Sequence, residues 1–144
     1  MKVSTRTHYG LRVMSYLACH HAQGPVSLRE VAVDQALPLK YLEHLCAALK
    51  AAGLIKSVRG AGGGYALVLE PDAISLWDIY RVLEGELTTV DCLQDGHGCR
   101  SDGDCPTREV WAQMSEAVKQ VLEQSKLADV ARDGRCNCLV RKEE

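Results

Sequence analysis

Apolar side chains recur at every third or fourth position through most of the N-terminal half of the chain, a spacing typical of helices with one buried face. Three helices are predicted there: residues 4–22, a short helix that begins after Ser27, and residues 38–52. Two strand-like segments follow, 54–59 and 65–69, and the glycine-rich loop 60–64 between them predicts a hairpin. The order helix, helix, turn, helix, hairpin is that of a winged helix-turn-helix.

The C-terminal half predicts three further helices: residues 75–85, 106–124 and 125–131. Along the long middle one, apolar residues alternate by three and four: Trp111, Met114, Val118 and Val121. This is the spacing of a coiled-coil seam, so we expect the helix to pair with a second copy. The predicted fold class is mostly α: a winged helix-turn-helix with a two-stranded wing and a long C-terminal dimerisation helix.

Two helix starts carry capping signals. Ser27 has Glu30 three residues later as its capping-box partner, and Ser75 has Asp78 at the same offset. Cys46 lies on the apolar stripe of the third helix, which predicts a buried thiol, and we expect Cys19 to be buried as well.

Charge is divided unevenly between the two halves of the chain. Residues 1–70 hold eight Lys and Arg against four Asp and Glu, whereas the remainder holds nine against fifteen, for a formal net charge of −2. A basic first half suits a polyanionic partner. Hydrophobic residues make up 47% of the chain and Phe is absent, which excludes general disorder and predicts an aliphatic core.

The first eight residues lack the apolar segment of a signal peptide, and no run approaches the roughly 20 apolar residues of a membrane span. We therefore expect a cytoplasmic protein with no membrane partner and with reduced thiols. In that setting, several of the seven cysteines are expected to serve metal or redox chemistry rather than structural disulfides.

Cys92, Cys99 and Cys105 are separated by six and five residues in a polar, glycine-rich stretch. Structural zinc usually uses Cys-x2-Cys pairs, because tetrahedral coordination needs two thiolates close together. The wider spacing favours an iron–sulfur cluster, with zinc and unligated redox thiols as the alternatives. Three cysteines leave one ligand short, and the candidates for it are His8, His97, Cys136, Cys138 or an acid.

A helix-turn-helix places its second helix in the major groove, with the N-terminal residues at the base edges. The positions of that helix expected to be exposed are Lys40, Tyr41, Glu43 and His44. The predicted DNA-binding residues are these four together with Arg59, Gly60, Lys56 and Lys2. Lysine can donate to guanine, glutamate can accept from cytosine, and tyrosine and histidine can reach phosphates or bases. Arg59 stands at the base of the wing, where an arginine can enter a minor groove.

Three strings of this chain resemble the Rrf2 family of bacterial winged-helix transcription regulators: Thr7–Arg12, Leu39–Leu45 and Gly53–Tyr65. The resemblance spans about residues 1–132, and the three downstream cysteines are similar to those of its iron–sulfur branch, whose members are IscR-like or NsrR-like.

The resemblance implies a homodimer whose long helices pair, a cluster near that interface, and palindromic promoter DNA as the partner. It implies that Glu43 and Lys40 read bases, that Tyr41 and His44 support that contact, and that Arg59 enters the minor groove. It also implies that the three cysteines hold the cluster, with [2Fe–2S] favoured over [4Fe–4S].

The chain departs from both branch patterns at the fourth ligand. IscR-like members place a histidine three residues after the last cysteine, where this chain has Arg108, which as a cation cannot ligate. NsrR-like members use an acid in the first helix of the partner subunit, at the position of His8. Imidazole ligates iron in Rieske centres, so we predict that His8 is the fourth ligand, supplied in trans.

The predicted function is a sequence-specific DNA-binding transcription regulator. Its promoter affinity is switched by an iron–sulfur cluster that senses iron–sulfur status, redox state or nitric oxide. One alternative is a cluster-free repressor of the same fold, whose thiols at Cys92, Cys99 or the Cys136 and Cys138 pair sense redox state by forming disulfides. A second alternative is an iron–sulfur electron carrier or cluster scaffold. No nucleophile–base pair or phosphate-binding loop stands out, so we do not expect an enzyme.

These expectations divide the chain into four parts. They are a winged helix-turn-helix DNA-binding domain (1–85), a cysteine-rich cluster-binding loop (86–106), a dimerisation helix region (107–132) and a flexible tail (133–144).

Overall fold

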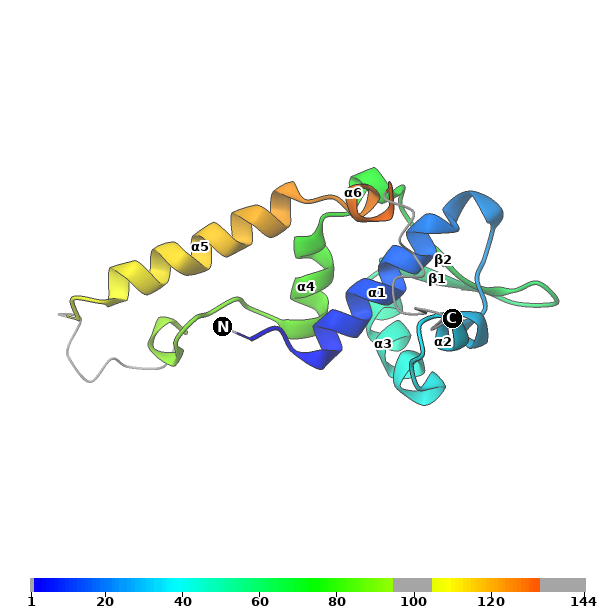
Figure 1. Cartoon of the computed structure of the whole chain (residues 1–144), viewed down its shortest axis with the longest axis horizontal. Helices are drawn as coiled ribbons and strands as arrows, with labels where there is room; N and C mark the ends of the chain where they lie inside the picture. The colour runs from blue at the N-terminus through cyan, green and yellow to red at the C-terminus, as the bar shows by residue number, and fades with distance from the viewer. Residues whose placement is uncertain (1, 95–104, 133–144) are drawn as a thin grey trace, which may run out of the picture.

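A winged helix-turn-helix body and one long helix that reaches away from it make up the part of the chain that the computed structural model describes, residues 2–94 and 105–132 (Figure 1). The helices are α1 (Thr5–Cys19), α2 (Leu28–Asp34), α3 (Leu39–Ala51), α4 (Leu76–Glu84), α5 (Arg108–Gln124) and α6 (Leu127–Arg132). The strands are β1 (Ile55–Val58) and β2 (Gly64–Leu67), and the 3-10 turns are η1 (His21–Gln23), η2 (Pro71–Ala73) and η3 (Asp91–Leu93). The predicted fold class and the order of its elements are confirmed.

The core lies where α1, α3 and α4 meet. The apolar stripe predicted for the third helix is fully buried there: Leu42, Leu45, Cys46 and Leu49. Helices α1 and α4 cross closely at Gly10, where an added Cβ would lie 2.1 Å from the Leu83 side chain. A small residue at that position therefore lets the two helices pack.

The helix-turn-helix is fixed by polar contacts around α2. Tyr16 of α1 donates its hydroxyl to Asp34 of α2, and the Glu30 carboxylate lies 3.4 Å from the same hydroxyl. The capping box predicted for Ser27 and Glu30 is therefore wrong: the Ser27 hydroxyl accepts from the Arg29 N–H, and Glu30 accepts from Tyr16. The Glu30 carboxylate bonds to Tyr16 of another helix instead of closing the local capping box.

The wing is a two-stranded antiparallel hairpin, with Ile55 opposite Leu67 and Val58 opposite Gly64. A backbone bridge between Val26 and Tyr65, with two hydrogen bonds of 2.8 Å, ties its second strand to the chain just before α2. Gly64 has no room for a side chain, because a Cβ there would lie 2.1 Å from the Val26 carbonyl oxygen. The wing is thus attached rigidly at its base.

Helix α4 begins with the capping box whose residues the sequence supplies, Ser75 and Asp78, and is followed by Gly85. Near its other end, Glu84 accepts hydrogen bonds from the hydroxyls of Ser4 and Thr7 at the start of α1. The first turn of α1 and the last turn of α4 are therefore joined.

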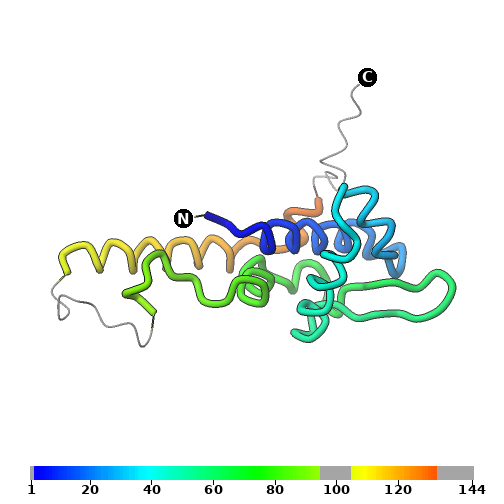
Figure 2. The backbone as a smooth tube through the Cα atoms, turned by 90° about the horizontal axis from the view of Figure 1, so that it is seen from below, coloured from blue at the N-terminus to red at the C-terminus, as the bar shows by residue number. Residues whose placement is uncertain are grey.

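Helix α5 projects from the body, and Figure 2 shows it extending away from the wing, past the N-terminus. None of its residues is buried. Helix α6 instead returns to α1, with Leu127 fully buried and its N–H bonded to the Ile74 carbonyl at 2.9 Å. Helix α5 thus lies outside the core, and the next helix, α6, packs against the core.

Candidate nucleic-acid interface and cysteine site

The first two turns of α3 present a polar surface. Lys40, Glu43 and His44 are exposed, as the sequence predicts for residues that contact bases. They stand on a helix whose opposite face is fully buried, so the core determines the direction in which they point.

Tyr41 is placed differently from the prediction. It is half-buried rather than exposed, and its ring packs edge-on against Tyr9 of α1, with the centroids 5.8 Å apart. The Arg12 guanidinium lies 5.6 Å from the centre of the Tyr9 ring and donates to the Gln35 carbonyl, just before α3. Tyr41 therefore packs between α3 and α1, while Lys40, Glu43 and His44 face solvent.

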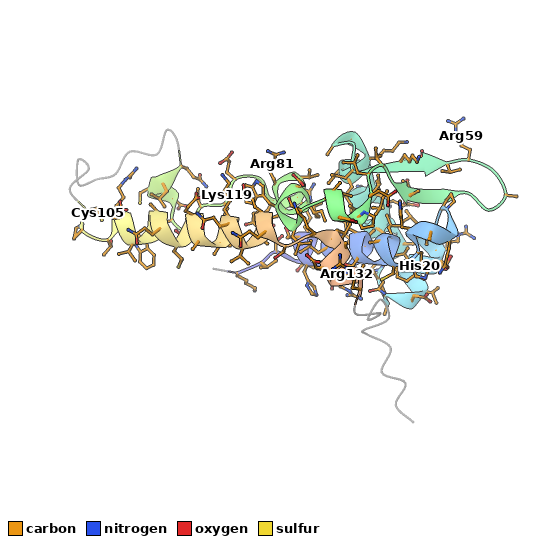
Figure 3. The ribbon with its side chains drawn as sticks, turned by 90° about the horizontal axis from the view of Figure 1, so that it is seen from above. His20, Arg59, Arg81, Cys105, Lys119 and Arg132 are labelled. Atoms are coloured by element: carbon orange, nitrogen blue, oxygen red, sulfur yellow. The ribbon has the colours of Figure 1, made fainter. Side chains whose placement is uncertain are left out.

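Lys56 and Arg59 are exposed along the wing, and Gly60 adopts a φ of +102°, which a residue with a side chain rarely does. Figure 3 shows Arg59 at the end of the molecule opposite Cys105. Lys2 precedes the first turn of α1, and Figure 2 shows that this end of α1 points away from the wing.

Cys92 and Cys105 are placed beside the same end of α5. Cys92 lies in η3, Cys105 lies three residues before α5, and Arg108 Nη1 donates to the Cys92 carbonyl oxygen at 2.8 Å. Upstream, Thr89 Oγ1 donates to the Trp111 carbonyl at 3.1 Å, and the Thr89 N–H donates to Ser115 Oγ at 3.3 Å. We call residues 86–94 the Cys92 segment; it lies along α5.

The Cys105 thiol has a lowered pKa. The Thr107 hydroxyl, 3.3 Å from the sulfur, is the main cause, and the Thr107 and Arg108 backbone N–H groups and the Arg108 charge act in the same direction. A lower pKa favours the thiolate, which is the form that ligates metals and attacks electrophiles. Burial instead raises the pKa of the Cys46 thiol to about 12, which makes that core cysteine unreactive.

Cys19 does not follow its prediction. It is half-buried, its sulfur lies 3.6 Å from the Ala131 carbonyl oxygen, and it is disulfide-bonded, which corrects both the buried site and the reduced thiol that we expected there. The physical reason is its place at the last turn of α1, beside α6 rather than inside the core. Cys46, Cys92 and Cys105 carry free thiols.

His8 is exposed on α1, with its ring centroid 5.7 Å from that of Tyr9. Among the described residues of a single chain, no three His, Cys, Asp or Glu side chains gather closely enough to hold a metal ion. The assignment of His8 as a ligand in trans remains a prediction. Cys99, His97, Cys136 and Cys138 lie outside the described residues.

Sequence reasoning missed the polar contacts that fix these surfaces, namely Arg108 to Cys92, Thr89 to α5 and Tyr9 to Tyr41. Each joins elements that are distant along the chain, so no local pattern signals them. Within the residues that the structure describes, no helix is both long and apolar enough to cross a membrane.

Comparison with known proteins gives a consistent result. The sequence model of the Rrf2 family, described as "Iron-dependent Transcriptional regulator", matches residues 3–133. The HTH-type transcriptional regulator CymR of Bacillus subtilis (strain 168) is 46% identical over 131 residues, 91% of this chain and 90% of that protein. The regulator IscR of Aliivibrio salmonicida is 32% identical over 92% of this chain and 79% of its own length.

Solved structures are similar as well. The structure of CymR, "the Global Cysteine Regulator of B. subtilis", superposes with a TM-score of 0.79 at 44% identity and covers 92% of this chain and 98% of that one. The structure of "T. potens IscR" gives a TM-score of 0.77 at 43% identity and covers 93% of this chain and 88% of that one.

Proposed function

Because the chain belongs to the Rrf2 family of transcriptional regulators, and is thus a DNA-binding regulator, we propose that its affinity for promoter DNA is switched by an iron–sulfur cluster. Cys92, Cys99 and Cys105 hold the cluster, and [2Fe–2S] is favoured over [4Fe–4S]. The signal is iron–sulfur status, redox state or nitric oxide.

The observation that carries this proposal is the pair of free thiols beside one end of α5. The residues present fit an anionic, thiolate-held group, because the pKa of Cys105 is lowered by Thr107 and Arg108, and the cation of Arg108 lies beside Cys92. When bound, the cluster would supply a redox-sensitive and nitric-oxide-sensitive centre. The chain's own residues supply the thiolates, a positive charge, and attachment to α5.

We propose a homodimer that pairs along α5. The described residues cover the apolar seam of that helix only in part: Trp111 and Val118 are half-buried, whereas Met114 is 36% exposed and Val121 is 63% exposed. The two recognition helices would then read half-sites of a palindrome about 34–36 Å apart. A small change in the angle between the paired helices alters that separation, so a centre bound at one end of α5 shifts the population between tight-binding and weak-binding dimers.

At the DNA, Lys40 and Glu43 contact base edges from the exposed face of α3, and His44 assists them. Tyr41 supports that contact from its half-buried position against Tyr9. Arg59 enters the minor groove, with Lys56 and Gly60 beside the backbone and Lys2 contributing charge from the other end of α1.

A second candidate is a cluster-free regulator of the same fold that senses redox state through its thiols. The comparisons support this reading better than the cluster, because CymR is the more identical of the relatives described above and is described as the global cysteine regulator of B. subtilis. A structure of the "Staphylococcus aureus CymR oxidized form" is also 39% identical to this chain. The spacing of the three cysteines in the present chain supports the cluster. A reading as an electron carrier, scaffold or enzyme has no support, since the relatives are transcription regulators.

Anaerobic purification separates the two candidates. We expect a brown dimer with iron and acid-labile sulfide, and a Cys92→Ser variant that loses both. A colourless, metal-free wild-type protein that binds its promoter and responds to thiol oxidants would contradict the cluster and favour the second candidate.

A further inference from the structure

Arg108 forms a long-range contact that the cysteine pattern gives no reason to expect. It lies in the first turn of α5, is half-buried, and donates from Nη1 to the Cys92 carbonyl oxygen at 2.8 Å. Its target is a backbone atom of the residue that also carries a thiol. The contact therefore holds the backbone of Cys92 and does not involve its sulfur.

A second set of contacts fastens the same segment further along α5. Thr89 bonds to the Trp111 carbonyl and to Ser115, whose own hydroxyl also donates to the Trp111 carbonyl at 3.0 Å. Between the two attachments, the turn η3 is closed by Leu93 N–H to the Val90 carbonyl and Gln94 N–H to the Asp91 carbonyl. The Cys92 segment is thus attached to α5 at two places, by Arg108 in the first turn and by Thr89 further along the helix.

We propose that Arg108 is a positioning residue that holds Cys92 beside the first turn of α5 before any centre binds. In its second role, the Arg108 guanidinium stabilises the anionic cluster at the same place. A guanidinium suits both roles, because it keeps its charge at all physiological pH values and donates in a fixed plane. The first role rests only on the contacts above, whereas the second rests on the proposed function. Arg108 acts through Cys92 and is not a ligand.

Hydrogen–deuterium exchange on the cluster-free, full-length protein tests the first role. In an Arg108→Ala variant we expect the Leu93 and Gln94 amides to exchange about threefold to tenfold faster, the range that loss of one hydrogen bond predicts. Arg132→Ala is the matched control, since Arg132 is an exposed arginine of the body that pairs with Asp129 at 3.4 Å (Figure 3). Equal exchange in Arg108→Ala and wild type would overturn this role.

The midpoint potential of the loaded dimer tests the second role. A nearby cation stabilises the more negative, reduced cluster, so Arg108→Gln should make the potential more negative and shorten the cluster lifetime in air. Arg108→Lys keeps the charge and should retain the wild-type potential. Identical potentials in all three proteins would overturn the electrostatic role. A wild-type protein that never holds iron would end both this role and the proposed function, while the exchange result would still decide the first role.

Discussion

The winged helix-turn-helix body and helix α5 differ in what covers their apolar side chains. In the body, Leu42 and Leu49 are fully buried by neighbouring helices of the same chain. Along α5, Val121 is 63% exposed and Met114 is 36% exposed. The body is therefore completed by its own contacts, whereas these apolar side chains of α5 are left exposed, as the proposed pairing with a second copy requires.

This difference suits the proposed sensor role. A region with few buried contacts opens at lower free-energy cost than a packed core, so the proposed centre could shift its geometry while the DNA-reading surface stays intact. The contacts of Cys92 and Thr89 with α5 are polar and lie near the surface, so they belong to the region with few buried contacts.

The largest effect is expected from a cavity in the body. Leu49→Ala removes a fully buried side chain from α3 and should lower the free energy of unfolding by about 2–5 kcal/mol, measured by urea denaturation at fixed dimer concentration. The matched change on α5, Val110→Ala, removes an exposed side chain and should change stability by less than about 0.5 kcal/mol. Equal losses in the two variants would contradict the contrast between the regions.

A charge placed on the seam of α5 should act on assembly instead. Val121→Glu brings an uncompensated charge from each subunit into the pairing surface, so we expect the dissociation constant of the dimer to rise about a hundredfold, roughly 3 kcal/mol. Analytical ultracentrifugation measures it. Gln120→Glu adds the same charge to the adjacent exposed position and should leave the dimer unchanged. If both variants remain equally dimeric, α5 does not form the interface.

Two substitutions on the DNA-reading surface should have smaller and distinct effects. Glu43→Ala should cost about 1–3 kcal/mol on the cognate promoter and relax the preference at one base pair, because the side chain is proposed to read a base. Arg59→Ala should weaken binding and reduce the salt dependence of the affinity. Fluorescence anisotropy at several salt concentrations measures both. Unaltered affinity in both variants would exclude this face as the DNA contact.

The smallest effect concerns the joint between α1 and α4. Hydrogen bonds from Ser4 and Thr7 lower the pKa of Glu84, so the folded state favours the ionised carboxylate. Its contribution is present above the ordinary pKa of about 4.5 and is lost as pH falls through the lower pKa of the folded state. Because Glu84 is exposed, the contribution should stay below about 1 kcal/mol.

Urea denaturation between pH 6 and 3 measures this contribution as part of the pH dependence of stability. Glu84→Gln should flatten that dependence, whereas Glu86→Gln, at an exposed position two residues away, should preserve it. A Glu84→Gln profile that matches wild type would show that the joint does not depend on the carboxylate charge.

Much of the body could be predicted from the sequence, because periodicity and caps act locally. The Ser75 cap, the buried stripe around Leu49 and the wing strands all follow from residues close together in the chain. The Glu30 prediction failed because Tyr16, from another helix, bonds to its carboxylate. The predicted place of Tyr41 failed because a helix position facing solvent in isolation meets Tyr9 in the fold.

The surroundings of Cys92 and Cys105 were predictable only in part. The spacing identified Cys92 and Cys105 as candidates, but it could not show that Arg108 contacts the Cys92 backbone, since that contact depends on how the Cys92 segment lies along α5. The disulfide at Cys19 and the return of α6 to α1 depend in the same way on three-dimensional neighbours. The four-part division of the chain stays a prediction; the burial of Leu127 shows that the region after α5 also contributes to the core.

The most direct test is the promoter affinity of one anaerobic preparation, measured before and after its inorganic centre is removed with a chelator under reducing conditions. We predict a change of about 5-fold to 150-fold between the two forms, with the dimer preserved, as expected for typical coupling between two sites. Equal affinity of the two forms across promoter sequences, or a preparation with no centre to remove, would contradict it.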